Sequence, residues 1–114
     1  MITVEMFFVK NEDYLQAVEL DEVFFFTREN GRVVAVLKNG KIELTASLYQ
    51  VYELLEKKQT FFRCHKSYVV NVSKIEKISR YHNKTYNIKF RGIKEQAYIT
   101  EVNLQILKKR FLAL

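Results

Sequence analysis

The sequence predicts a mostly β domain, built from short antiparallel sheets or an open barrel, with two short helices. Three observations lead to this prediction. Short runs rich in Val, Ile, Phe and Tyr recur between turn signals along the 114 residues. Asn39-Gly40 separates two such runs, which is a strong hairpin signal. Only two segments, near residues 47–58 and 100–111, have the spacing of apolar residues that is typical of a helix.

The strands follow one another at short intervals along the chain. The turn at Asn39-Gly40 is expected to be of type I′, because Asn and Gly accept positive φ angles. A second hairpin turns at His82-Asn83-Lys84, and Arg91-Gly92 leads into the last strand. Strands are expected at residues 6–10, 16–20, 23–26, 32–38, 41–46, 74–81, 85–90 and 95–99.

Each helix begins at a residue that can cap it. Ser47 and Gln50 have the spacing of a capping box, and Thr100 is placed to cap the second helix. The apolar faces of both helices are expected to pack against the core rather than to hold a cofactor. These faces consist of Leu48, Val51, Tyr52 and Leu55 in the first helix and Leu104, Leu107 and Phe111 in the second.

Charge is distributed unevenly along the chain. Residues 1–57 hold 6 Lys and Arg and 10 Asp and Glu, a net charge of −4. Residues 58–114 hold 13 Lys and Arg and 3 Asp and Glu, a net charge of +10. Such a chain can present a basic face to a polyanion such as DNA, and the alternative is that these residues are the solvated side chains of strands.

Neither catalysis nor a cofactor is indicated. The sequence has no Gly-rich phosphate loop, no G-x-S-x-G elbow and no paired-acid motif, so the chain is not expected to be an enzyme or to take a small-molecule substrate. One Cys and two His, with His65 and His82 far apart, show no metal-ligand spacing. Cys64 is expected to be a small buried hydrophobe, and no exposed aromatic platform for stacking bases can be identified.

The stretch at residues 61–71 places basic, hydrogen-bonding side chains between two apolar segments. Its pattern, Phe-Phe-Arg-x-His-x-Ser-Tyr-x-Val-Asn, resembles the central motif of the LytTR family, the DNA-binding output domain of many bacterial response regulators. The order of expected elements resembles the family from about Leu20 to Phe111. This resemblance implies a single domain over residues 1–114 that binds duplex DNA through loops, acting as a sequence-specific transcription regulator in the bacterial cytoplasm.

The resemblance also implies where DNA is bound: residues 27–32, 63–67 and 100–103. Arg pairs with guanine and Asn with adenine, so base readout is expected from Arg28, Asn30, Arg32 and Asn103. Contacts to phosphate, or support of the loops, are expected from Arg63, His65, Lys66, Thr100, Lys84 and Arg91. Ser67 and Asn71 are expected to hold the central loop through hydrogen bonds to the backbone.

Several of these roles have an alternative. Asn30, together with Gly31, could serve only to make a turn. Arg63 could pair with a carboxylate instead of DNA, and His65 could be a hydrogen-bonded structural residue. Lys84 and Arg91 could be solvated charges.

Two positions depart from the family pattern. Many members carry a large polar residue where this chain has Gly31, and an arginine or another long polar residue where it has Val102. Either base readout is taken over by Asn103, Glu101, Thr100 and Asn30, or the protein reads a different or looser site than its relatives. A further alternative is that the domain has become a protein-interaction module with weak or non-specific DNA binding.

The remaining expectations concern partners and chain ends. Two copies are expected to dock on repeated half-sites as a dimer, and a regulatory protein, such as a membrane-bound inhibitor, could control a standalone member. Residues 1–19 lie outside the strongest part of the resemblance and could form an extra edge strand, a dimer contact or the remains of a linker.

Overall fold

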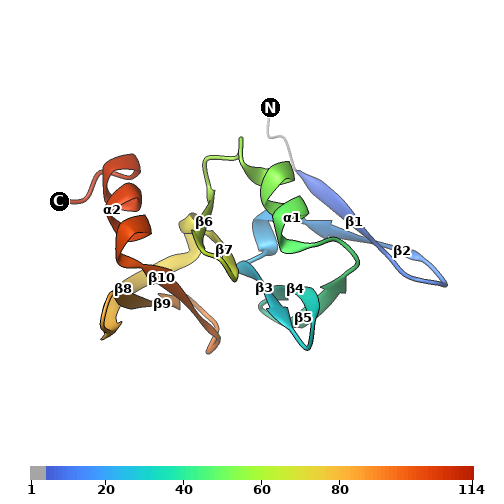
Figure 1. Cartoon of the computed structure of the whole chain (residues 1–114). Helices are drawn as coiled ribbons and strands as arrows, with labels where there is room; N and C mark the ends of the chain where they lie inside the picture. The colour runs from blue at the N-terminus through green and yellow to red at the C-terminus, as the bar shows by residue number, and fades with distance from the viewer. Residues whose placement is uncertain (1–4) are drawn as a thin grey trace.

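A computed structural model describes residues 5–114 and has three antiparallel sheets and two α-helices, which confirms the mostly β prediction (Figure 1). One sheet has five strands, one has three, and one is a two-stranded hairpin. In chain order the elements are β1 (Met6–Lys10), β2 (Leu15–Glu19), the 3-10 helix η1 (Leu20–Glu22), β3 (Phe25–Glu29), β4 (Arg32–Leu37), β5 (Gly40–Leu44), α1 (Leu48–Leu55), β6 (Phe61–His65), β7 (Tyr68–Asn71), the 3-10 helix η2 (Val72–Lys74), β8 (Ile75–His82), β9 (Thr85–Phe90), β10 (Gln96–Thr100) and α2 (Glu101–Arg110).

The five-stranded sheet has the strand order β5-β4-β3-β7-β6. Its middle strands are buried on both faces, so this sheet forms the centre of the molecule. Neighbouring residues of one strand point to opposite faces, and both faces are covered. Phe25 therefore belongs to one apolar cluster and Phe26 to the other, and Val34 and Ala35 of β4 divide in the same way. Burial on both faces explains the uninterrupted apolar runs in these strands.

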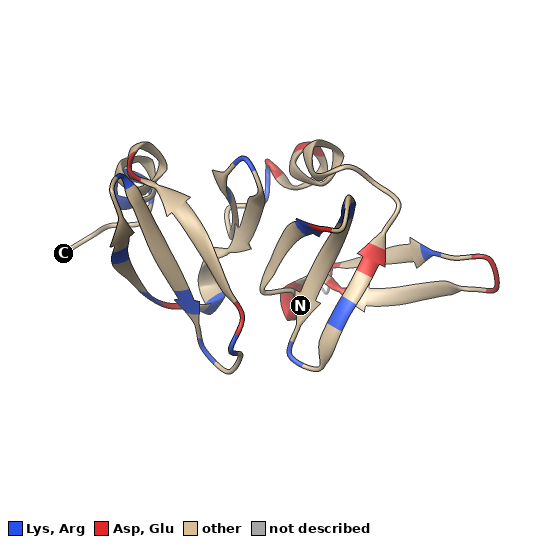
Figure 2. Ribbon diagram, turned by 60° about the horizontal axis from the view of Figure 1, so that its bottom comes forward, with Lys and Arg blue, Asp and Glu red and all other residues tan. Residues whose placement is uncertain are grey.

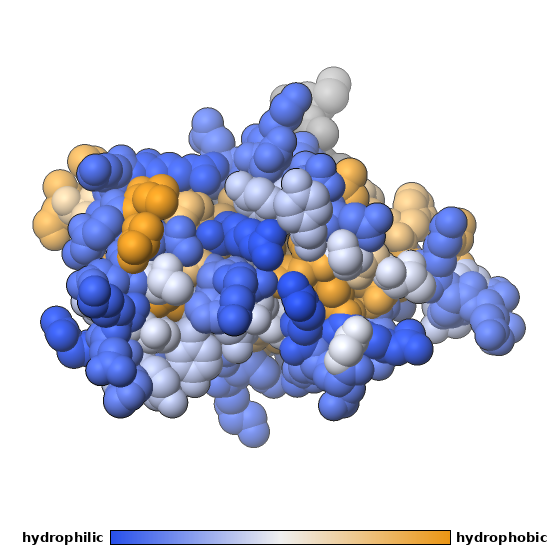
Figure 3. All heavy atoms as spheres, in the orientation of Figure 1, coloured by the Kyte–Doolittle hydropathy of each residue, from blue (hydrophilic) through white to orange (hydrophobic). Residues whose placement is uncertain are grey.

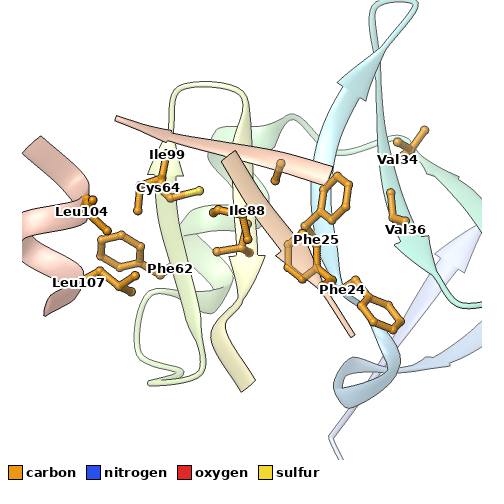
Figure 4. Close-up of a cluster of buried hydrophobic side chains, with 13 residues drawn as sticks. Phe24, Phe25, Val34, Val36, Phe62, Cys64, Ile88, Ile99, Leu104 and Leu107 are labelled. Carbon is orange, nitrogen blue, oxygen red and sulfur yellow. The ribbon is translucent and has the colours of Figure 1, made fainter. Parts of the chain in front are cut away.

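The two clusters are covered by different elements. On one face, α1 and the β1–β2 hairpin cover the sheet; on the other, the β10-β9-β8 sheet and α2 do so. Figure 4 shows Phe62 and Cys64 of β6 facing Leu104 and Leu107 of α2. The Phe25 ring stacks on Phe90 of β9, with centroids 5.1 Å apart, which joins the large sheet to the small one.

Both predicted helix caps are present. The Ser47 hydroxyl accepts a hydrogen bond from the Gln50 amide, and the Gln50 side chain accepts one from the Ser47 amide. Thr100 caps α2 by accepting from the amide of Asn103. The predicted apolar faces of both helices pack into the core, with Tyr52 and Phe111 partly buried at the edges.

The turn predictions need one correction. Asn39-Gly40 is not the centre of a type I′ turn, because Leu37 pairs with Gly40 and the two turn residues are Lys38 and Asn39, whose φ angles are not positive. The tight turn with two positive φ angles is instead at Asn30-Gly31, with φ of 53° and 76°. Residues 27–32 are thus a strand, a two-residue turn and the start of a strand rather than an open loop.

The bounds of the third strand also differ from prediction. The third strand begins at Phe25 instead of Val23, because Val23 follows the 3-10 helix η1 and donates its amide to the Leu20 carbonyl. Residues 6–19 form a separate hairpin that projects from the body at the right of Figure 1. Neither α1 nor α2 is long and apolar enough to cross a membrane, and no other α-helix occurs in residues 5–114.

Candidate nucleic-acid interface

The turn after β3 and the turn after β6 lie at the same edge of the large sheet. Strands β3 and β7 are antiparallel, and their paired region ends where Thr27 lies opposite Tyr68. The Thr27 hydroxyl donates to the Ser67 carbonyl at 2.8 Å. Beyond this bond, Arg28 and Asn30 continue past the β6–β7 turn and are exposed to solvent. Two of the three predicted segments are therefore adjacent.

The β6–β7 turn consists of Lys66 and Ser67 and is braced by side chains of β6. His65 Nδ1 accepts from the Ser67 amide at 3.1 Å, and Arg63 Nη2 donates to the Lys66 carbonyl at 3.1 Å. The Arg63 guanidinium also lies over the Tyr52 ring, 5.6 Å from its centroid. Lys66 is exposed at the tip. Ser67 acts here through its backbone, and the carboxylate partner considered for Arg63 is replaced by a carbonyl.

Asn71 has the structural role that its position predicted, but at the other end of β7. Its Nδ2 donates to the Val23 carbonyl at 2.9 Å, and its Oδ1 accepts from the Ser73 amide and hydroxyl. These bonds hold the start of the 3-10 helix η2 against the segment between η1 and β3, and they do not reach the β6–β7 turn.

The third segment caps its own helix and is joined to the second segment by one side-chain hydrogen bond. Thr100 Oγ1 accepts from the Asn103 amide at 3.3 Å, and Asn103 Nδ2 donates to the Cys64 carbonyl at 3.0 Å. The Glu101 amide donates to the Lys84 carbonyl at 2.8 Å, which attaches the start of α2 to the β8–β9 turn. Thr100 and Asn103 are both predicted to contact DNA, but the Thr100 hydroxyl caps α2 and the Asn103 amide group joins α2 to β6.

Arg32 is the predicted base reader for which the described residues supply a charged partner. Arg32 lies 4.0 Å from Glu43, with both side chains largely exposed, so this pair restrains Arg32 weakly. Glu29, next to Arg28, pairs with Lys41 at 2.7 Å. Arg28 and Asn30 remain at the solvent-facing end of the hairpin.

Arg91 makes its hydrogen bonds outside the three predicted DNA-binding segments. Its guanidinium donates to the Ile75 carbonyl at 2.7 Å and to the Ser73 carbonyl, so it braces the junction between η2 and β8. Lys84 is exposed in the β8–β9 turn beside the start of α2. The structure therefore brings Lys84 to the candidate interface and gives Arg91 a scaffold role.

An aromatic row that the sequence did not reveal lines the space between the second and third segments. Ring centroids are 5.0 Å apart for Tyr81 and Tyr98, 5.9 Å for Tyr98 and Tyr68, and 5.6 Å for Tyr68 and His65. These residues line a shallow hollow of about 340 Å³ with Thr85. The four rings come from β8, β10, β7 and β6, so only the tertiary fold assembles them.

Burial affects two titratable groups beside the β6–β7 turn. Partial burial, and then the charge of Lys66, lower the pKa of His65, which favours the neutral ring that accepts from Ser67. Burial raises the pKa of the Cys64 thiol to about 12, and its Sγ lies 3.2 Å from the Tyr98 carbonyl. Cys64 is fully buried, which confirms its predicted place in the core.

Positive charge is concentrated in the part of the chain that includes two of these segments. Figure 2 shows Lys and Arg over the β8–β9–β10 sheet and α2, whereas the tip of the β1–β2 hairpin is acidic. All of the basic residues behind the net charge of +10 over residues 58–114, except Lys58, lie between the start of β6 and the end of α2. A basic surface with exposed turns at one edge is suited to a polyanion.

Comparison with known proteins agrees with this geometry and gives the class, a DNA-binding domain. Residues 13–112 match a sequence model of the LytTr DNA-binding domain. The chain belongs to the LytTR family of DNA-binding domains. It is 36% identical over 78 residues to Accessory gene regulator protein A of Staphylococcus epidermidis, covering 67% of this chain and 30% of the relative. It is 32% identical over 105 residues to the Staphylococcus aureus protein of the same name, covering 90% of this chain and 40% of the relative.

A solved structure has the same fold. A LytTr DNA-binding domain of a response regulator from Bacillus cereus superposes with a TM-score of 0.77 at 21% identity, covering 95% of this chain and 97% of that chain. This likeness supports the fold. The chain spans less than half the length of the two staphylococcal relatives described above.

Proposed function

We propose that this protein is a bacterial transcription regulator that binds duplex DNA in a sequence-specific manner. The observation that supports this proposal is the adjacency of the β3–β4 turn, the β6–β7 turn and the start of α2, linked by the Thr27–Ser67 and Asn103–Cys64 hydrogen bonds. Segments linked in this way can keep a fixed spacing along one side of a duplex. Non-specific affinity would come from the basic surface, and discrimination from side chains that reach base edges.

The residues of the candidate interface would then have different roles in DNA binding. Lys66 is the phosphate ligand, because it is exposed at a turn tip and an ammonium group positions well but discriminates poorly. Arg28 and Asn30 are the base readers of the first segment. Arg63 and Asn103 hold the turns at their spacing through the bonds described above.

The wider biological role is also part of the proposal. Two copies would bind repeated half-sites in the cytoplasm, and a regulatory protein would set when they do so. The relatives named above are gene regulators that extend well beyond the matched region. Their complete function is therefore only a hypothesis for this chain.

The direct test is selection from a randomised duplex library at physiological salt with excess non-specific competitor. Enrichment of a repeated motif is the expected result. A pool with no enriched sequence would reject sequence-specific binding and favour the alternative, a LytTR-fold protein-interaction module. The number of protein copies per selected duplex, measured by mass photometry, would then test the two-copy hypothesis.

Lys66→Ala tests the phosphate assignment. Affinity is expected to fall by a similar factor on selected and on random duplexes, because a phosphate contact carries no sequence information. Lys10→Ala is the matched control, since Lys10 is an exposed lysine on the separate β1–β2 hairpin. Fluorescence anisotropy measures both. A loss confined to the selected sequence, or an equal loss in Lys10→Ala, would contradict the assignment.

A further inference from the structure

The segment at residues 100–103 presents an apolar side chain to solvent. Thr100 and Asn103 are half-buried and hydrogen-bonded to each other, and the Asn103 amide group is also bonded to the Cys64 carbonyl. Glu101 is half-buried as well. Val102, in contrast, is 71% exposed, so it is the one side chain of this segment that is free to meet a partner over most of its surface.

Val102 lies close to both basic turns. The Glu101 amide is bonded to the Lys84 carbonyl, so the residue before Val102 is fixed to the β8–β9 turn. Asn103, the residue after it, is fixed to β6 just before the turn that bears Lys66. Val102 therefore stands at the positive end of the α2 dipole, in a setting that attracts phosphate. Figure 3 shows that apolar atoms are exposed over α2 within a mostly hydrophilic surface.

A valine in this position can recognise only one feature of a base edge. Val has no donor or acceptor, so it cannot read the hydrogen-bonding atoms of guanine, cytosine or adenine. Thymine is the base that offers a methyl group in the major groove, and apolar side chains contact it there. We infer that Val102 is a specificity-determining residue that contacts a thymine 5-methyl group in the major groove. This inference rests on the proposed sequence-specific DNA binding.

Replacing thymine by uracil isolates this contact, because it removes the methyl group and leaves the base pair intact. In the selected duplex, each thymine is replaced in turn by deoxyuridine, and affinity is measured by anisotropy for the full chain. At one thymine per half-site, the replacement is expected to lower the affinity of the wild type about fourfold, which corresponds to the free energy of burying one methyl group. Val102→Ala should bind the thymine duplex more weakly and lose the penalty at that position.

Ile106→Ala is the matched control, because Ile106 is a β-branched residue one turn further along the same face of α2 and is 47% exposed. It should keep the wild-type uracil profile. The inference would be overturned if Val102→Ala kept the wild-type pattern of affinities across the uracil-substituted duplexes. It would also be overturned by an equal loss of affinity in both variants, which would indicate contact between protein copies through α2. If selection yields no enriched duplex, the proposed function fails first. Thermal melting checks that both variants are folded.

Discussion

Individual residues chosen for their hydrogen-bonding groups often use those groups inside the fold. Asn103 donates to Cys64, Arg63 to Lys66 and Arg91 to two carbonyls at the η2–β8 junction. A donor that suits a phosphate suits a carbonyl equally well, so residue type alone could not separate these roles. Lys66, Arg28 and Asn30, by contrast, are exposed in or beside the β3–β4 and β6–β7 turns. The bonds that each side chain makes in the fold, which residue type does not give, separate the two groups.

The hydrogen bond from the Ser67 amide to His65 Nδ1 predicts a pH dependence of stability. The pKa of His65 is lowered in the folded protein, so the unfolded chain binds the proton more readily. The free energy of unfolding should therefore fall as pH drops through about 6.5, the ordinary value for histidine. Urea denaturation between about pH 7.5 and 5.5 measures it.

His65→Gln should flatten this dependence, because glutamine does not titrate. His82→Gln is the matched control, since His82 is an exposed residue at the end of β8, and it should keep the wild-type slope. The assignment to His65 fails if His65→Gln and the wild type have the same pH dependence.

At the scale of elements, two Asn-Gly pairs behave differently although their sequences are alike. Asn30-Gly31 forms the tight turn between β3 and β4, while Gly40 follows a turn made by Lys38 and Asn39. The register of each hairpin decides which residues occupy the turn, and register depends on which strand residues are buried. The presence of glycine at position 31 is thus explained by the positive φ angle of 76° that this turn requires, although other family members carry a side chain there.

Gly31→Ala should destabilise the domain by about 1–2 kcal/mol, because alanine is disfavoured at positive φ. Apart from Gly31 and its two chain neighbours, no residue has a heavy atom within 4 Å of the position that the Cβ would take, so the cost comes from the backbone rather than from a clash. Gly31→Asn is the matched variant, and it should lose less, since Asn tolerates this conformation. Urea denaturation compares them. Equal losses in both variants would show that the turn conformation is not the cause.

The whole molecule is polarised in charge, and this predicts its response to salt. The logarithm of DNA affinity should fall linearly with the logarithm of salt concentration, with a slope of about −0.9 for each phosphate neutralised. Lys66→Ala should reduce the magnitude of that slope by about 1, whereas Lys10→Ala should leave it unchanged. Anisotropy titrations at several salt concentrations provide the slopes. Affinity that is insensitive to salt would contradict binding through the basic surface.

Local signals in the sequence determined much of the architecture. Both helix caps, the β8–β9 hairpin and the apolar faces of α1 and α2 follow from side chains a few residues apart, and the structure confirms them. The order of the elements and the LytTR motif were sufficient for the family. These features depend on interactions within one turn or one hairpin, and such interactions are encoded in neighbouring residues.

Only the tertiary structure decided which residues form the candidate interface. The row of His65, Tyr68, Tyr81 and Tyr98 draws on four strands. The start of α2, where Val102 is exposed, is bonded through Asn103 to a residue 39 positions away. Contacts between distant segments are set by how sheets pack and how strands align. The sequence indicates each of the three candidate segments separately. The packing of the two sheets and α2 brings these segments to one edge of the molecule.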